Sequence, residues 1–290
     1  MNKEFNFLNI ISKNLNDSSF LGNDCAYLDE YSLAVSHDTL IEDVHFSFLY
    51  MNANEIAQKA MLVNISDILA SGAKPKYATI SLSGKLDEHL VNNFYLGINE
   101  IAREYDIKII GGDLTKADKL IVSITVFGDY KNRQVSKRNN AKENYIVAVA
   151  GEFGSSAKGL KELQEGLKES YFIDYHKKPK LYPKISQMIA KNAAKPYAMM
   201  DSSDGLIDCL FQISKKSNVQ INVDYSLIPK KVENEELVLF GGEDYSLVCC
   251  LDEEDFKKIP ELIKIGYCSN GSGVFVDNNE IEYKGFKHFE

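Results

Sequence analysis

Short apolar runs alternate along the chain with longer segments in which apolar residues recur every three to four positions. The short runs are rich in β-branched and aromatic residues and predict strands at residues 33–35, 77–82, 107–110, 120–127, 145–149, 219–223, 245–250 and 274–276. The longer segments predict helices at residues 54–71, 92–105, 156–168, 183–192 and 205–216. Because strands and helices alternate, we expect an α/β or α+β fold.

A polar stretch at residues 129–144 interrupts this alternation near the middle of the chain. It carries several charges and few large apolar side chains, and it divides the 290 residues into comparable halves. A chain of this length can form two domains of ordinary size. We therefore expect one domain over residues 1–137 and a second over residues 138–290.

The overall composition is that of a globular protein with an acidic balance. Apolar residues make up 44% of the chain and charged residues 26%, and the formal net charge is -9, which opposes general nucleic-acid binding. No apolar run reaches the roughly 18 residues of a membrane helix, and the first residues lack the pattern of a signal peptide. The five cysteines have no metal-type CxxC spacing. We expect a cytoplasmic protein that binds neither nucleic acid nor membrane and keeps its cysteines reduced.

Aspartates recur beside glycine, serine and the strand-like runs. The motifs are Gly22-Asn23-Asp24, Ser36-His37-Asp38, Asn64-Ile65-Ser66-Asp67, Gly111-Gly112-Asp113 and Asp201-Ser202-Ser203-Asp204-Gly205, with Gly241-Gly242-Glu243-Asp244 as a relative. A carboxylate at the end of an apolar strand is poorly placed for a core and well placed for a hard cation. Mg²⁺ is usually bound through a few carboxylates plus substrate phosphates. The pattern predicts a Mg²⁺–nucleotide enzyme.

Each motif alone also has a simpler interpretation. Asp67 shares a helix face with Asn64 and is either a cation ligand or a polar residue at a helix rim. The Gly-Gly pair before Asp113 is common in turns, although the ends of strands often bind ligands. Asp201 and its neighbours could cap a helix, and a lone histidine such as His45 is more often packed or on the surface. The chain has neither GxxxxGK[ST] nor GxGxxG, so ATP would be bound without the P-loop lysine.

Taken together, the motifs resemble those of the thiamine-monophosphate kinase family, whose fold is shared with aminoimidazole ribonucleotide synthetase. The resemblance extends through residues 36–46, 63–75 and 284–289 and spans nearly the whole chain in the family's order. It implies two α/β domains: a metal- and ATP-binding dimerisation domain over residues 1–137 and a C-terminal domain over residues 138–290. It further implies a homodimer whose N-terminal sheets join into a barrel. The implied activity is ATP-dependent conversion of thiamine monophosphate to thiamine diphosphate with several Mg²⁺ ions.

The resemblance also assigns site residues by their motif positions. The implied magnesium residues are Asp24, Ser36, His37, Asp38, Asp67, Asp113, Asp201 and Asp204. The implied ATP contacts are Gly112, Asp113, Arg138 and Ser203. The implied contacts to thiamine monophosphate are His45, Glu243 and Phe286. No catalytic base or nucleophile is assigned, because a phosphate monoester with a second pKa of about 6 is already an ionised nucleophile near neutral pH.

Two positions depart from the family pattern. Asn23 stands where an aspartate is usual, and His37 stands where a threonine is usual. If the family's metal contact at the second position uses the backbone carbonyl, His37 changes little, and if it uses the hydroxyl, that contact is altered. These departures keep open a second hypothesis, a non-catalytic sensor of thiamine phosphates or nucleotide.

A third hypothesis is another ATP-dependent enzyme of the same superfamily. Cys25 is not in the arrangement of the reactive cysteine of selenophosphate synthetases, and Glu290 stands where hydrogenase maturation proteins end in cysteine. These two mismatches oppose this third hypothesis, and retention of six aspartates favours the kinase over the sensor, because a pure binder has less need for so many cation ligands.

Overall fold

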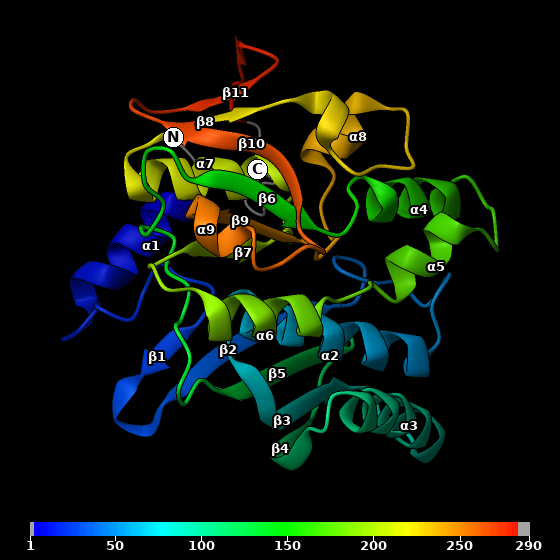
Figure 1. The fold of residues 1–290 in the computed structure, drawn as a ribbon. Helices are drawn as coiled ribbons and strands as arrows, with labels where there is room; N and C mark the ends of the chain where they lie inside the picture. Colours follow the sequence, from blue (N-terminus) through cyan, green and yellow to red (C-terminus); the bar gives the residue numbers. More distant parts are fainter. Residues whose placement is uncertain (1–2, 284–290) are drawn as a thin grey trace.

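The computed structural model describes residues 3–283, which form two β-sheets with helices packed against them (Figure 1). In spatial order, the first sheet contains β1 (Ala26–Leu28), β2 (Leu33–Ile41), β5 (Ile121–Asp129), β3 (Lys74–Gly84) and β4 (Lys108–Lys116). The second contains β12 (Asn279–Glu280), β11 (Val274–Val276), β8 (Gln220–Val223), β10 (Ile263–Ser269), β6 (Ile146–Ala150), β9 (Leu247–Leu251) and β7 (Ala198–Asp201). This mixed arrangement confirms the predicted fold class.

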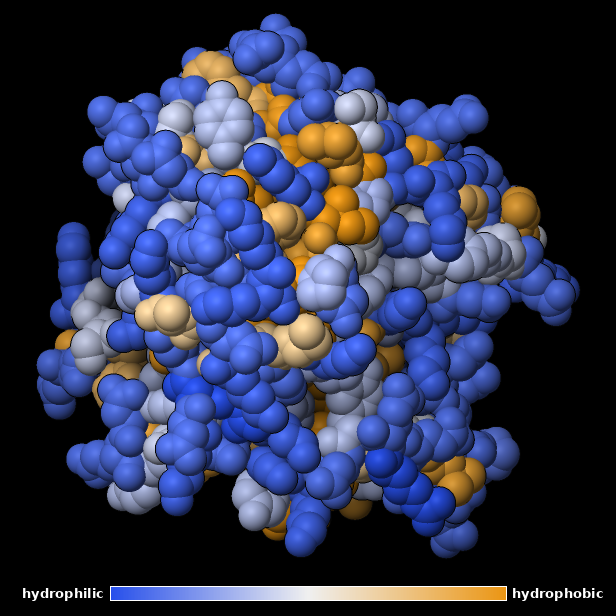
Figure 2. Space-filling model, in the orientation of Figure 1, coloured by the Kyte–Doolittle hydropathy of each residue, from blue (hydrophilic) through white to orange (hydrophobic). Residues whose placement is uncertain are grey.

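The helices connect and cover these strands. They are α1 (Lys3–Asn14), α2 (Ala53–Ala70), α3 (Glu88–Glu104), α4 (Ser155–Gln164), α5 (Tyr171–Lys177), α6 (Pro183–Asn192), α7 (Leu206–Ser217), α8 (Glu235–Phe240) and α9 (Glu253–Phe256). Short 3₁₀ helices occupy Asp29–Tyr31 and Tyr225–Leu227. Within residues 3–283, none of the helices combines the length and apolar character that crossing a bilayer requires. The face in Figure 2 is mostly hydrophilic, with hydrophobic residues gathered mainly over the half that holds the second sheet.

The first sheet has one covered and one open face. In β5, Val122, Ile124 and Val126 are fully buried and alternate with the half-buried Ser123 and Thr125, as the two-residue period of a strand requires. Helix α2 packs on the buried side with α3 beside it (Figure 1). The opposite face is more polar and stays accessible to solvent.

Helix α2 lies between the first sheet and the second domain. It begins with a capping box in which Asn52 and Glu55 satisfy each other's backbone amides. One side contacts β2 and β5, and the other contacts β7 and α6. The helix is therefore buried nearly all round, and even Lys59 and Asn64 are 0% exposed. Polar side chains at these positions need partners inside the protein.

The second sheet is buried on both faces at its centre. Helices α7 and α8 pack on one side of β6 and β9, and α6 and α9 pack on the other. All residues of β6 and β9 are buried, which explains why both strands read as continuous apolar runs in the sequence. Residues 130–145 connect the two sheets and contain the predicted boundary between residues 137 and 138.

The structure also differs from the predicted elements. The strand predicted at residues 107–110 continues through the glycine pair as β4, because parallel pairing with β3 holds it extended. Gly112 is needed for that pairing, since a Cβ there would lie 1.8 Å from the Ile80 carbonyl oxygen. The short elements β1, α5 and α8 were not predicted, because segments of three to seven residues carry too few positions to show a period.

Candidate active site

Three aspartates from distant parts of the chain meet where the two domains pack together. Asp24 precedes β1, Asp67 lies in the last turn of α2, and Asp201 ends β7. One carboxylate oxygen of each lies within 4.8 Å of those of the other two. Helix α2 packs against β7 in this region, so contacts between the domains assemble the group. All three residues belong to the predicted magnesium set.

Negative charge in this group exceeds the positive charge beside it. Within residues 3–283, the cation that forms an ion pair with one of the three carboxylates is Arg138, whose Nη2 lies 2.7 Å from Asp24 Oδ1. Burial, together with Asp24, raises the pKa of Asp201 to about 7. Burial and the charge of Asp201 raise the pKa of Asp67 well above its ordinary value, and burial also raises that of Asp38. A cluster of hard oxygen donors with unbalanced negative charge fits a divalent cation such as Mg²⁺.

Strand β2 contributes to the same group through alternate residues. Ser36 and Asp38 face α2, and His37 points to the open face of the sheet, where its Nδ1 lies 2.8 Å from a threonine hydroxyl of β5. The Ser36 hydroxyl donates to Asp67 Oδ2 at 2.6 Å, and the Asp38 amide donates to the Asn64 side chain at 2.9 Å. Asn64 thus holds β2 against α2. From the sequence we predicted only that Asn64 lies on the same helix face as Asp67.

Gly112 and Asp113 lie apart from the three aspartates. They are on β4, and the register pairs Asp113 with Ser81 of β3. Strands β5 and β3 separate β4 from β2. Three inter-strand spacings place Asp113 about 14 Å from the Asp38 strand within one chain. The structure therefore does not bring Asp113 to the other predicted ligands of the same chain.

The segment between β7 and α7 holds Ser203 and Asp204. The N-cap of α7 is Gly205, with a φ of 99°, and no side chain caps the helix. The simple capping interpretation of this motif is therefore wrong. The Ser203 hydroxyl donates to Asp204 at 3.2 Å, and the Ser203 carbonyl accepts from the Glu243 amide at 2.7 Å. The Asp204 loop and the Gly241–Tyr245 loop are thus held side by side.

Glu243 forms a second charged group at the domain junction. The Lys59 ammonium lies 3.2 Å from each of its carboxylate oxygens. Burial opposes ionisation of Glu243, but the charge of Lys59 outweighs it, and the pKa of the carboxyl lies below its ordinary value. His45, whose Nδ1 accepts from the Ile41 amide at 3.1 Å, is close enough to add to this lowering. No sequence motif indicates a role for Lys59, although it lies about two turns before Asp67 in α2.

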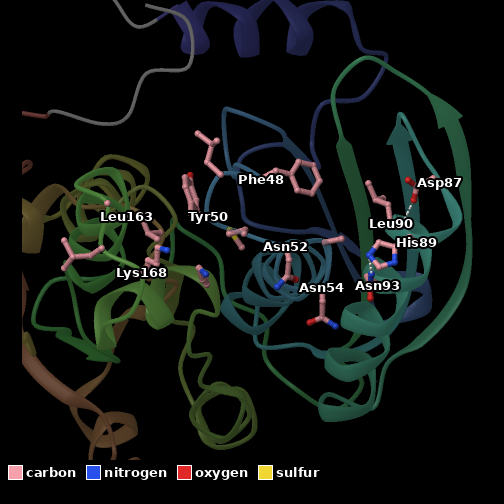
Figure 3. Close-up of a pocket in the computed structure, with 16 residues that line it drawn as sticks. Phe48, Tyr50, Asn52, Asn54, Asp87, His89, Leu90, Asn93, Leu163 and Lys168 are labelled. Carbon is pink, nitrogen blue, oxygen red and sulfur yellow. Dashed lines mark hydrogen bonds between the residues drawn. The ribbon is translucent and has the colours of Figure 1, made fainter.

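A cavity of about 1080 Å³ lies near this second group, and Figure 3 shows the residues that line it. The segment before α2, the start of α3 and the segment after α4 line it, and the lining includes Phe48, Tyr50, His89 and Lys168. The Tyr50 ring centroid lies 6.5 Å from that of His176, which connects the cavity to the Lys59–Glu243 pair. The cavity offers aromatic and polar surface to an organic ligand. Phe286, the third predicted substrate contact, lies outside the described residues.

The chain is similar to known proteins over most of its length. Residues 22–130 match the model of the AIR synthase related protein, N-terminal domain. The thiamine-monophosphate kinase of Bacillus subtilis is 37% identical, covering 87% of this chain and 87% of the relative. That of Aquifex aeolicus is 33% identical, covering 99% and 98%.

The solved structures show the same relationship. One described as AaThiL complexed with AMPPCP and TMP matches with a TM-score of 0.89 and 31% identity, covering 99% of this chain and 97% of that one. The hydrogenase maturation protein HypE of E. coli matches with a TM-score of 0.72 and 18% identity, covering 98% of each chain. The second likeness concerns the fold alone.

Proposed function

The chain belongs to the thiamine-monophosphate kinase family, and from this membership we propose that it transfers the γ-phosphoryl group of ATP to thiamine monophosphate, giving thiamine diphosphate and ADP. The observation that carries the proposal is the junction itself, where the Asp24, Asp67 and Asp201 carboxylates converge. The related AaThiL structure holds an ATP analogue and TMP together. We further propose that the protein acts in the cytoplasm.

We call the group formed by Asp24, Asp67 and Asp201 the aspartate corner, and the group formed by Lys59 and Glu243 the Glu243 corner. The residues of the aspartate corner would hold Mg²⁺ through their converging oxygens, and Asp38 adds a carboxylate from β2. When bound, Mg²⁺ supplies positive charge that neutralises phosphate oxygens. Arg138 supplies guanidinium donors beside the same corner and is proposed to contact the nucleotide, since arginine binds phosphate in a bidentate geometry.

The protein's own groups contribute mainly position and charge. The acceptor oxygen of thiamine monophosphate is ionised near neutral pH, so in-line attack on the γ-phosphorus needs no protein base. Ser203, at the entrance to α7, is proposed to donate to a phosphate oxygen. His45 and Glu243 are proposed to hold the thiamine part at the neighbouring corner, with the negative charge of Glu243 facing a substrate that carries a cationic thiazolium ring.

We propose that residues 1–137 bind metal and nucleotide and also form the dimer interface. The dimer interface is proposed because the first sheet is open at both edges. Strand β1 pairs only with Leu33–Val35 of β2, so in residues 3–283 no strand neighbours residues 36–41 on that side. The outer edge of β4 also lacks a described neighbour and exposes Ile110 by 57% and Leu114 by 55%. Long open edges invite pairing with another chain.

Pairing of β4 from one copy with the free edge of β2 in another satisfies both edges and closes the two sheets into a barrel. The same arrangement accounts for Asp113, which is about 14 Å from the β2 site in its own chain. Asp113 of the partner subunit would then lie beside the Ser36-His37-Asp38 segment. The proposed active site is therefore shared between the two copies of a homodimer.

The proposed reaction is tested by incubating the purified protein with ATP, Mg²⁺ and thiamine monophosphate. Formation of thiamine diphosphate and ADP in equal amounts, abolished by a chelator and restored by Mg²⁺, is the expected result. Tight binding of thiamine monophosphate without turnover would instead support the sensor, and hydrolysis of ATP without phosphoryl transfer would support another ATP-dependent activity.

A further inference from the structure

A lysine is fully buried at the junction between the domains. Lys59 lies in α2, its side chain is 0% exposed, and its ammonium contacts both oxygens of Glu243 at 3.2 Å. A third contact, at 3.3 Å, is to His176 Nε2. A buried ammonium is costly unless it is paired and hydrogen-bonded, and these three contacts satisfy it. The pair joins the N-terminal domain to the C-terminal one.

The histidine in this group is neutral. An ammonium has only donors, so His176 Nε2 must accept from Lys59, and the ring proton is on Nδ1. That nitrogen lies 2.9 Å from the Ser156 hydroxyl, which can accept from it. Burial and the charge of Lys59 lower the pKa of His176 to about 3. The positive charge that Glu243 faces in this group is therefore that of Lys59.

The backbone beneath Glu243 is fixed by the C-terminal domain. Glu243 and Tyr245 have φ values of 64° and 52°, a region that non-glycine residues occupy only when their surroundings enforce it. The Asp244 carboxylate enforces it by accepting from the amides of Gly154 at 2.6 Å and Ser156 at 2.8 Å, at the start of α4. The loop position is thus set within one domain, and the direction of the Glu243 side chain is set by a lysine from the other.

We propose that Lys59 is a positioning residue for thiamine monophosphate, holding the Glu243 carboxylate in the direction in which it faces the cationic part of that substrate. The inference rests on the proposed function. Glu243 keeps 28% of its side chain exposed, so the carboxylate can contact both Lys59 and a ligand. The cavity beside Tyr50 provides space for the ring system on the same side. Lys59 itself is buried and does not touch the substrate.

The test compares Lys59→Met with Lys178→Met. Lys178 also pairs across the domains, with Glu104 at 3.8 Å, but this pair is half exposed and does not contact Glu243. We expect K59M to raise the KM for thiamine monophosphate by about tenfold or more, with the KM for ATP changed by less than about twofold. K178M should leave both KM values within about twofold of wild type. Lys59→Arg, which retains the charge, should recover part of the loss.

A double-mutant cycle with Glu243→Gln separates positioning from general stability. If Lys59 acts through Glu243, K59M/E243Q should have the same KM for thiamine monophosphate as E243Q alone. If K59M fails to fold, the same cycle is run with K59R, which keeps the buried charge, and the effect of K59R should likewise disappear in the E243Q background. Additive effects, or a rise in the KM for ATP equal to that for thiamine monophosphate, would overturn the inference.

Failure of the proposed function gives a different result. If the wild-type protein makes no thiamine diphosphate, the kinase proposal fails, and calorimetric affinity for thiamine monophosphate replaces KM for the same variants. Weaker binding by K59M alone then supports the positioning role. Equal affinity of wild type and K59M, or no binding by the wild type, refutes it.

Discussion

At one corner of the domain junction, Asp24, Asp67 and Asp201 place their oxygens within 4.8 Å of one another. Among residues 3–283, the cation paired with this group is Arg138, which contacts Asp24. At the other corner, Glu243 has a fully buried lysine on its two oxygens. Both corners bury carboxylates between the same two domains. The pKa of Asp201 is raised to about 7, whereas that of Glu243 lies below its ordinary value.

The difference lies in where the compensating charge comes from. The Glu243 corner contains its own cation and is complete as folded, so its carboxylate is available in ionised form to a cationic ligand. The aspartate corner has too little positive charge of its own, and a cation bound from solution would balance it. We therefore propose that one junction provides two kinds of negative site, one for a metal ion and one for the organic substrate.

The largest effect is expected from Asp201→Asn. Loss of one carboxylate from the aspartate corner should lower turnover by about 100-fold or more, because charge stabilisation is the main contribution to phosphoryl transfer. The same change removes mutual repulsion, so the metal-free variant should melt about 3–5 °C above wild type. Initial rates of thiamine diphosphate formation and thermal unfolding in a chelator measure the two effects. Wild-type turnover at saturating Mg²⁺ would contradict the metal assignment.

The next largest effect concerns Asp113, which lies apart from the aspartate corner of its own chain. Asp38→Asn and Asp113→Asn should each be nearly inactive alone. When the two are unfolded, mixed equally and refolded, half of the dimers are mixed, and each mixed dimer has one site with both aspartates intact if the site is shared. Activity should therefore return to about a quarter of wild type. No recovery in a confirmed mixed dimer would place both residues in one subunit's site.

The third prediction concerns pH. In the metal-free protein the pKa of Asp201 is about 7, above its ordinary 3.8, so the folded state binds this proton more tightly than the unfolded chain. Its contribution to stability is complete below pH 3.8 and is lost as the pH rises through 7. The melting temperature in chelator should therefore fall between pH 5.5 and 8, and Mg²⁺ should restore it most at pH 8.

Asp201→Asn provides the control for this pH dependence. The variant should flatten part of the slope but not all of it, because burial also raises the pKa of Asp244 to about 7. Asp244 is bound by the amides at the start of α4 and should respond to pH without responding to Mg²⁺. A slope that is unchanged in D201N would remove Asp201 as its source.

The contrast between the corners also shows what the sequence can and cannot predict. Asp24, Asp67 and Asp201 stand out in local motifs, because each sits beside glycine, serine or a strand. Lys59 has no such signal. A regular helix predicts one buried face, whereas α2 is buried nearly all round because the second domain covers its other side. Only the docking of the two domains makes this lysine a buried partner of Glu243.

Topology explains the remaining difference. The Gly-Gly-Asp motif was predicted beside the other aspartates on the strength of its sequence, but the sheet order places two strands between β4 and β2. Strand order depends on contacts across the whole domain, which local patterns do not encode. The elements with long periodic patterns, such as α2 and β5, were predicted closely, and β1 and α5 were not.

The smallest effect is expected from placing a carboxylate at Asn23, where the resemblance to the family implies an aspartate. The Asn23 side-chain oxygen accepts from the Arg138 amide at 3.2 Å, and an aspartate would accept the same bond, so Asn23→Asp should keep the local fold. It adds negative charge beside Asp24, in a corner that already lacks compensation. The metal-free protein should melt about 1–2 °C lower, and the Mg²⁺ concentration for half-maximal activity should fall about twofold. Mg²⁺ titrations of activity and melting curves in chelator measure both.

Because Glu243 has its own cation, the KM for thiamine monophosphate should stay unchanged in Asn23→Asp. A shift in that constant would show that the two corners are not independent.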